Sequence, residues 1–531
     1  MTANKIESSL IKEQQLAELV KLVQTITSPN AYAPEWASEP SHVTAQSSID
    51  SIEEFQQLLD DLSLEGLGSE GFGNAVSLLS QHSVNNSSPG FLGKLVSAPS
   101  PPGIAADLFL SIFNNNGHVW RASPALTSVE KHVSGALARL FGLKGPHAGG
   151  ITVPGGAAGN MLALLVARNI LSPESKQQGV TPGKYAVFVS NSAHYSMSNA
   201  AQILGLGHDS VIYVPTLEDE TMDVDLLEAA VDAAIQAGRK PLFINATAGN
   251  TVNGAFDAID RIGAIARKTN AWFHIDACWG GAVAFSDNLR HLIKGSELAD
   301  SIAFNPHKML GVPLVCAFLL TNDLRTLWLA NQLSAGYLFH DKATASSGGS
   351  ASNQKEPNEH NIENDWRNSK LLNDAPEVSN IRDLASLTVQ CSRRSDATKM
   401  FLHWVYYGTK GIAREVEQAV DSAQHLAKLV EAHPRLELIG EVQKVFAQVC
   451  FYWGPKGEVN GTSDKGRTSA TNSKNTHILY EHLTEQGWKI DYAPYKERGD
   501  CIRIACNRLT ARPGVEALVA NLVDLGESLE L

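Results

Sequence analysis

The chain has 531 residues, of which 43% are hydrophobic and 19% charged, so two or three packed domains are possible and disorder throughout is excluded. A formal net charge of −13 provides no basic face, so nucleic-acid binding is not expected. No apolar run approaches the roughly 18 residues of a membrane span. Six scattered cysteines and the absence of an apolar leader predict a cytoplasmic protein without membrane contact.

Residues 1–108 are predicted to form an N-terminal segment of short helices and irregular chain, with a proline-rich break at 99–103. Residues 109–399 then alternate short β-rich runs with amphipathic helices. Strands are expected at 185–190, 211–214, 242–245, 272–275 and 317–320, and helices at 161–170, 256–268 and from Val224 to a stop at Gly238. This order predicts an α/β fold with a mostly parallel sheet covered on both faces.

The polar residues 341–377 cannot bury a core and are predicted to form a flexible loop, either a lid or a linker without function. Residues 400–531 are expected to form a smaller α+β domain. Near its end, Val515, Leu518, Val519 and Leu522 share one helical face. The predicted division is therefore 1–108, 109–399 and 400–531.

A lysine ends the sequence Asn-Pro-His-Lys at 305–308, directly after the apolar run 301–304. Lysine is rarely buried without a partner, so the ordinary interpretation is a strand end that emerges into solvent. The alternative is a desolvated amine whose lowered pKa lets Lys308 form an imine with a carbonyl compound.

An aspartate closes another apolar run, in the sequence His-Ile-Asp-Ala-Cys-Trp-Gly-Gly at 274–281. Asp276 is either an N-cap or turn residue, or it needs a buried cation as its partner. A protonated pyridine nitrogen is such a cation, and an aspartate that keeps this proton in place makes the ring an electron sink. Asp276 is therefore a candidate cofactor ligand.

Small residues open the helix expected at 161–170, in the sequence Gly-Gly-Ala-Ala-Gly-Asn at 155–160. Backbone N–H groups at such a start can approach a phosphate, although glycine pairs are also common in ordinary turns. His194 follows the strand expected at 185–190 and either stacks on an aromatic cofactor or has only a structural role. In an open α/β sheet these segments fall at the carboxyl ends of strands, where ligands bind.

Taken together, these segments resemble the group II decarboxylases that depend on pyridoxal 5'-phosphate (PLP), the family of glutamate, aspartate, cysteine-sulfinate and aromatic L-amino acid decarboxylases. The resemblance extends over roughly residues 80–525 and includes the stretches at 193–196, 245–251, 335–339 and 390–394. It implies the aspartate-aminotransferase fold of type I, a homodimer, and a carboxy-lyase. No metal site is expected.

The resemblance also implies roles for individual residues. Lys308 would hold PLP as a Schiff base, Asp276 would pair with its pyridine nitrogen, and His194 would stack on its ring. The residues implied around the ring substituents and the phosphate are Thr247, Gly156, Ala157, Asn305 and His307. The candidates for binding a substrate carboxylate are Arg503, which matches an arginine of the glutamate decarboxylases, with Lys94 and Arg121.

The predicted reaction is removal of the α-carboxylate from an acidic L-amino acid: aspartate, glutamate or cysteine sulfinate. Trp120 and the Ser-Pro-Ala sequence at 123–125 resemble the aromatic branch, so an aromatic substrate is one alternative. Between Leu338 and Ser392 the chain lacks the tyrosine that family members use to donate a proton, so oxidative deamination to an aldehyde is a second. A non-catalytic binding protein is a third. A Gly-x-Gly-x-x-Gly match at 66–71 follows no predicted strand and does not support a dinucleotide enzyme.

Overall fold

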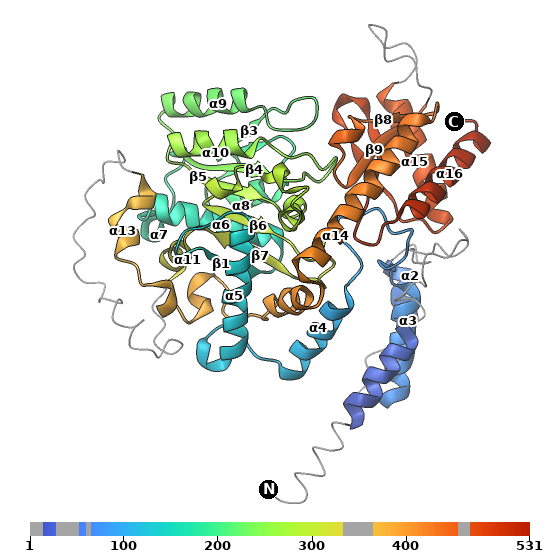
Figure 1. Ribbon diagram of the computed structural model, residues 1–531, viewed down its shortest axis with the longest axis horizontal. Helices are drawn as coiled ribbons and strands as arrows, with labels where there is room; N and C mark the ends of the chain where they lie inside the picture. Colours follow the sequence, from blue (N-terminus) through green and yellow to red (C-terminus); the bar gives the residue numbers. More distant parts are fainter. Residues whose placement is uncertain (1–13, 28–51, 60–64, 333–364, 455–467) are drawn as a thin grey trace, which may run out of the picture. The chain divides into compact units, whose positions relative to one another are not determined.

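The computed structural model describes residues 14–27, 52–59, 65–332, 365–454 and 468–531 (Figure 1). The chain divides into two compact units. The large unit comprises Leu95–Asp421 and Lys444–Gln448, and the small unit comprises Met1–Lys94, Ser422–Gln443 and Val449–Leu531. Residues 95–108 and 400–421 thus fall in the large unit, while the division at 108 and 399 stays a prediction from the sequence.

A seven-stranded sheet forms the centre of the large unit, in the order β1-β7-β6-β5-β4-β2-β3. Its strands are β1 (Gly149–Val153), β2 (Tyr185–Ser190), β3 (Val211–Val214), β4 (Lys240–Thr247), β5 (Trp272–Asp276), β6 (Ser301–Phe304) and β7 (Ala317–Thr321). Neighbouring strands are parallel except for β7, which is antiparallel to both β1 and β6. The predicted mostly parallel sheet is confirmed. The glycine-containing edge strand β1 was not among the predicted strands.

Two apolar cores lie on opposite faces of this sheet, because successive side chains of a strand point to opposite sides. In β7, for example, Phe318 belongs to one core and Leu319 to the other. The first core also contains residues of α5 (Pro124–Leu140), α9 (Val224–Gln236) and α10 (Ile259–Lys268), and the second contains residues of α6 (Gly156–Leu171), α8 (Ser196–Ile203) and α11 (Leu324–Asn331). Figure 1 shows α9 and α10 along one face. The helices therefore cover both faces, as predicted.

The remaining helices of the large unit are shorter or lie at its borders. They are α4 (Pro101–Phe113), α7 (Ser175–Gln178), α13 (Lys370–Asn373) and the first part of α14 (Ala397–Ala432). Helix α14 is interrupted at Gly408, whose φ of 63° is one that glycine adopts without strain.

The helix expected at 256–268 begins later than predicted, at Ile259. The carboxylate of Asp257 accepts hydrogen bonds from the backbone N–H groups of Met222 and Thr247, both at 2.7 Å. Phe256 forms a β-bridge with Ala248. These contacts hold residues 256 and 257 beside the end of β4, and no local sequence pattern reveals them.

Part of the predicted flexible loop, residues 341–364, lies outside the described residues, as does the matching stretch 335–339. The described residues 365–377 contain the 3₁₀ turn η7 (Trp366–Asn368) and α13. Trp366 stacks on Trp272 with ring centroids 4.9 Å apart, and Arg367 pairs with Asp300 at 2.5 Å. This end of the segment is therefore packed against the N-terminal end of β5.

The small unit contains a four-stranded sheet in the order β10-β11-β9-β8. Its strands are β8 (Leu436–Leu438), β9 (Gln448–Trp453), β10 (Asp491–Pro494) and β11 (Asp500–Ala505), of which Gln448 belongs to the large unit. Its helices include the last part of α14, residues 422–432, with α2 (Ile52–Leu58), α3 (Gly68–His82), α15 (Ser469–Glu485) and α16 (Arg512–Ser528). Val515, Leu518 and Leu522 of α16 are buried, as the predicted helical face requires, whereas Val519 is half-buried.

Candidate active site

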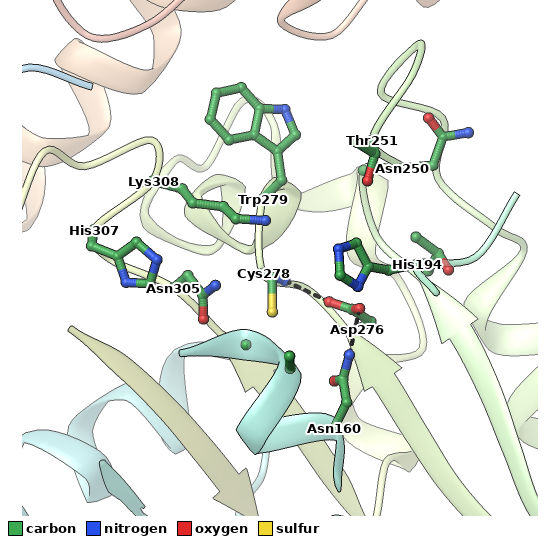
Figure 2. Close-up of a pocket in the computed structure, with 14 residues that line it drawn as sticks. Asn160, His194, Asn250, Thr251, Asp276, Cys278, Trp279, Asn305, His307 and Lys308 are labelled. Atoms are coloured by element: carbon green, nitrogen blue, oxygen red, sulfur yellow. Dashed lines mark hydrogen bonds between the residues drawn. The ribbon is translucent and has the colours of Figure 1, made fainter. Parts of the chain in front are cut away.

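A cavity of about 210 Å³ opens at the carboxyl ends of β4, β5 and β6 (Figure 2). Ligands of open α/β sheets bind at this edge. All eight residues that the sequence assigns to the cofactor line it: Gly156, Ala157, His194, Thr247, Asp276, Asn305, His307 and Lys308. Segments more than 150 positions apart in the chain therefore meet in one place, as their order along the sheet requires.

Asp276 is the last residue of β5 and is buried. Its Oδ2 accepts a hydrogen bond from Asn160 Nδ2 at 2.8 Å, and its Oδ1 accepts one from the backbone N–H of Cys278 at 3.1 Å. Burial raises the pKa of this carboxyl, but the positive charge of Lys308 and the two hydrogen bonds outweigh burial and lower the pKa below its ordinary value. Asp276 is therefore a buried carboxylate that stays ionised.

Lys308 lies in the turn after β6, where its backbone N–H bonds to the carbonyl of Asn305 at 3.0 Å. The residue is half-buried rather than fully buried, so its stem is enclosed while its amine reaches the cavity, as Figure 2 shows. An amine on a flexible stem beside a buried carboxylate suits covalent bonding to a carbonyl group.

His194 lies between β2 and α8 and is half-buried. Burial lowers the pKa of its imidazole and so does the charge of Lys308, while Asp276 acts in the opposite direction. Ser196 contacts Nδ1 of this ring twice, through Oγ at 2.8 Å and through its backbone N–H at 3.2 Å. His194 is thus a neutral ring with a fixed orientation at the cavity wall.

The start of α6 forms the floor of the cavity. Gly155 has φ of 106°, a conformation that favours glycine. A Cβ on Gly156 would lie 2.4 Å from Cys278 Sγ and 2.8 Å from Asn305 Nδ2, so only glycine fits there. The helix start contains only glycine and alanine residues up to Gly159, so its backbone N–H groups can approach an anion.

Three buried polar atoms that line the cavity have no hydrogen-bond partner among the described residues: Thr247 Oγ1, Asn250 Nδ2 and Asn305 Oδ1. Such atoms are costly unless a ligand or water satisfies them. Pyridoxal phosphate carries both donors and acceptors along its ring and an anion at one end. The residues present therefore fit this cofactor: an ionised aspartate, a lysine amine, a flat neutral ring, a helix start and unsatisfied polar atoms.

His307 is buried, and its Nδ1 lies 2.7 Å from the backbone oxygen of Cys316. Burial lowers the pKa of this imidazole to about 4. The ring is therefore neutral at physiological pH and cannot form an ion pair with a phosphate.

The three predicted substrate residues are not among the described residues that line the cavity. In the small unit, Arg503 and Lys94 both bind Oδ2 of Asp491, each at 2.7 Å. Arg503 also donates to the carbonyl of Gly93. Arg121 is exposed in the 3₁₀ turn η2 (Trp120–Ala122) of the large unit.

The other lining residues had no role assigned from the sequence, namely Asn160, Gly249, Asn250, Thr251, Cys278 and Trp279. All of them occur in stretches that the sequence singled out, at 155–160, 245–251 and 274–281. The signal available for Asn160 was a polar side chain in the first turns of an otherwise apolar helix. The Gly-rich match at 66–71 leads into α3, and the described element before it is the helix α2 rather than a strand.

Among the described residues, no helix combines the length and apolar character that crossing a membrane requires.

Comparisons with known proteins agree with this geometry. The chain matches the pyridoxal-dependent decarboxylase conserved domain over residues 70–353 and 364–453. It is 61% identical to a glutamate decarboxylase-like protein of Gibberella zeae, covering 99% of this chain and 100% of that one. It is 38% identical to an L-aspartate decarboxylase of Metarhizium robertsii, covering 90% and 87%.

Solved structures extend the comparison to the fold. The crystal structure of mouse CSAD in its apo form has a TM-score of 0.81 and 28% identity, and covers 98% of this chain and 99% of that one. The fold is therefore that of the type I PLP enzymes. The chain belongs to the pyridoxal-dependent decarboxylase family, and it is a PLP-dependent amino-acid decarboxylase.

Proposed function

We propose that the chain decarboxylates an acidic L-amino acid at its α-carboxylate, releasing carbon dioxide and an amine, with the chemistry in the cavity above β4–β6. One observation carries this proposal: Asp276 and Lys308 line the same cavity, and the charge of Lys308 helps to keep the buried Asp276 ionised. A carboxylate and an amine arranged in this way can hold the two ends of one aromatic cofactor.

Each predicted residue has a task in this proposal. Lys308 holds the cofactor covalently through Nζ, Asp276 keeps a proton on the ring nitrogen, and His194 packs on the ring face. The backbone at Gly156 and Ala157, with Asn305 and His307, holds the phosphate, and Thr247 Oγ1 donates to a ring substituent. When bound, pyridoxal phosphate supplies an electron sink that stabilises negative charge at Cα as carbon dioxide leaves.

The relatives support an acidic substrate. Their names include a glutamate decarboxylase-like protein, an L-aspartate decarboxylase and the cysteine sulfinic acid decarboxylase of mouse, which is 31% identical over 90% of both chains. All three names refer to amino acids with a second acidic group. We propose Arg503 and Lys94 as the cations for this group. Since both already pair with Asp491, a substrate anion would compete with that carboxylate.

The test is a screen of the purified enzyme, supplied with PLP, against all common amino acids and cysteine sulfinate for carbon dioxide release. The expected result is turnover of aspartate, glutamate or cysteine sulfinate, with the matching amine identified by mass. Turnover restricted to aromatic amino acids would overturn the acidic assignment and favour the aromatic alternative. No carbon dioxide from any amino acid by the PLP-loaded protein would favour a binding protein.

A second candidate reaction is oxidative deamination after decarboxylation, favoured by the absence of tyrosine between Leu338 and Ser392. Residues 339–364 of this stretch lie outside the described residues. The same screen separates the two reactions if oxygen uptake, hydrogen peroxide and aldehyde are measured beside the amine. Amine without peroxide eliminates the oxidative reaction.

We also propose that the protein is a homodimer in the cytoplasm. The face of α4 formed by Ile104, Leu108 and Ile112 is exposed, as are Phe109 and Phe113 at its end, and a second copy would cover this apolar surface. All six cysteines are free thiols, as in a reducing compartment. Sedimentation of the parent and of an Ile112→Glu variant tests the dimer, which the charge should weaken. Cell fractionation tests the compartment.

A further inference from the structure

We propose that Asn160, Ser196, His274 and Ser301 form a positioning network that fixes the orientation and the protonation of both Asp276 and His194. The proposal rests on the roles of Asp276 and His194 given above. All four residues are buried, and they come from α6, α8, β5 and β6 respectively. Only Asn160 lines the cavity; the other three lie behind it.

Asn160 is the hub of this network. Its Nδ2 donates to Asp276 Oδ2 at 2.8 Å and to Ser196 Oγ at 2.9 Å, and its Oδ1 lies 3.0 Å from His274 Nε2. An ionised carboxylate only accepts hydrogen bonds, so the amide nitrogen must face Asp276 and the amide oxygen must face His274. Figure 2 shows the Asn160 side chain reaching Asp276 from below. The charge of Asp276 thus dictates which way the amide points.

The orientation of Asn160 in turn selects the tautomer of His274. Because Asn160 Oδ1 is an acceptor, His274 Nε2 must carry the proton and Nδ1 must accept one, from Ser301 Oγ at 2.8 Å. Ser301 Oγ is free to donate because it accepts from Trp272 Nε1, a group that can only donate, at 2.8 Å. Each hydrogen bond from Trp272 through Ser301, His274 and Asn160 to Asp276 therefore has a defined donor and a defined acceptor, and only one set of directions satisfies all of them.

The second branch reaches His194 through Ser196. Ser196 Oγ accepts from Asn160 and can therefore donate to His194 Nδ1, which also receives the backbone N–H of Ser196. A ring nitrogen with two donors directed at it carries no proton, so the neutral imidazole holds its proton on Nε2. The network therefore leaves His194 with an N–H donor, and not an acceptor, for whatever binds beside it.

The network restricts rotation of the Asp276 carboxylate, because both of its oxygens accept hydrogen bonds. Asn160 holds Oδ2, and the backbone N–H of Cys278 holds Oδ1. A side chain held in this way is aligned for a cationic ring nitrogen before the ring arrives, so binding costs less ordering of the protein. The network belongs to the apoprotein and can be tested without turnover.

The main test compares two variants that remove the same kind of bond. Ser301→Ala removes a buried serine whose Oγ contacts a buried histidine Nδ1 at 2.8 Å. Ser100→Ala removes an equivalent contact to His403 at 2.9 Å, and neither Ser100 nor His403 lines the cavity. The measurements are thermal unfolding of the apoprotein, the dissociation constant for PLP, and the position of the visible absorbance band of the loaded protein.

We expect both variants to lower the unfolding temperature, Ser301→Ala by more because it also leaves Trp272 Nε1 without an acceptor. Only Ser301→Ala should weaken PLP binding, by about 10-fold, and shift the absorbance band. Equal PLP affinity and an unshifted band in Ser301→Ala would overturn the network. If Ser301→Ala does not fold, Asn160→Leu replaces it, because leucine keeps the volume and removes the donor to Asp276. For Asn160→Leu we expect roughly 10- to 100-fold weaker PLP binding, and unchanged affinity would overturn the proposal. If the parent protein itself takes up no PLP, the proposed function fails instead.

Discussion

Two carboxylates of this protein, Asp276 and Asp491, differ in how their hydrogen-bond and charge partners are supplied. In the large unit, Asp276 is surrounded by neutral hydrogen-bond donors and by the charge of Lys308, and unsatisfied polar atoms remain around it. In the small unit, Asp491 is the shared partner of Arg503 and Lys94, so each of these cations already has a carboxylate at 2.7 Å. The polar groups around Asp276 need a ligand to complete their hydrogen bonds, whereas Asp491 already has its ion-pair partners within the protein.

This difference separates two kinds of evidence for a binding residue. An unsatisfied buried group points to a ligand, because leaving it unpaired costs free energy. A charged residue that matches a family pattern points to a ligand only if its charge is available. Of the predicted cofactor residues, Thr247 and Asn305 meet the first criterion. The predicted substrate residues Arg503 and Lys94 would have to exchange Asp491 for a substrate anion.

The largest expected effect is at Lys308. Lys308→Ala removes the amine that we propose holds the cofactor, so we expect decarboxylation to fall to background and the visible absorbance of bound PLP to disappear from the purified protein. Lys240→Ala is the matched control, since Lys240 is also half-buried and its side-chain amine bonds to the carbonyl of Leu171, outside the cavity. Residual turnover well above background in Lys308→Ala would contradict the assignment.

The next effect is at Asp276. Asp276→Asn keeps the shape but cannot hold a proton on the ring nitrogen, so we expect kcat to fall by at least roughly 100-fold while PLP remains bound. Asp323→Asn, which alters a carboxylate paired with Arg325 outside the cavity, should retain most of the activity. Normal turnover by PLP-loaded Asp276→Asn would show that the negative charge of Asp276 is not needed for decarboxylation.

The pH dependence of stability tests whether the buried imidazole of His274 is neutral in the folded protein. Burial lowers the pKa of His274 to about 4, whereas the unfolded chain binds this proton near pH 6.5. The unfolded state therefore holds more protons between these values, and stability falls as the pH drops from about 6.5 to about 4. For His274 alone we expect a loss of about 2 kcal/mol between pH 6.5 and pH 5, measured by urea unfolding.

Two substitutions control this measurement. His274→Gln should reduce the slope and leave the part that comes from His307, whose pKa is also lowered to about 4. His291→Gln, at an exposed ring bonded to the carbonyl of Asn288, should leave the slope as in the parent protein. The same slope in His274→Gln and in the parent would mean that other groups dominate the acid sensitivity.

The smallest expected effect is at Asp491. Asp491→Asn frees Arg503 and Lys94 from a competing anion, so we expect KM for an acidic substrate to fall by about five-fold, the equivalent of an ion-pair contribution near 1 kcal/mol, with kcat unchanged. Asp225→Asn breaks a surface ion pair with Arg261 and serves as the control. A rise in KM would instead show that Asp491 positions the two cations for the substrate.

Much of the fold follows from local pattern alone. Strands β2, β3 and β6 coincide with the apolar runs that predicted them, because strands buried on both faces are continuous apolar segments. The start of α10 and the edge strand β1 did not follow. The first is set by the carboxylate of Asp257, which bonds to residues distant in sequence, and the second by pairing with β7.

The sequence by itself determined which residue types would meet at the cavity, because the carboxyl ends of neighbouring parallel strands meet at one edge of a sheet. Only the tertiary structure decided how each of these groups is held. The ionisation of Asp276 depends on Asn160, Cys278 and Lys308, and the pairing of Arg503 depends on Asp491. Spacing along the chain specifies strand order, whereas hydrogen-bond partners and the protonation they impose depend on distances of a few ångströms in three dimensions.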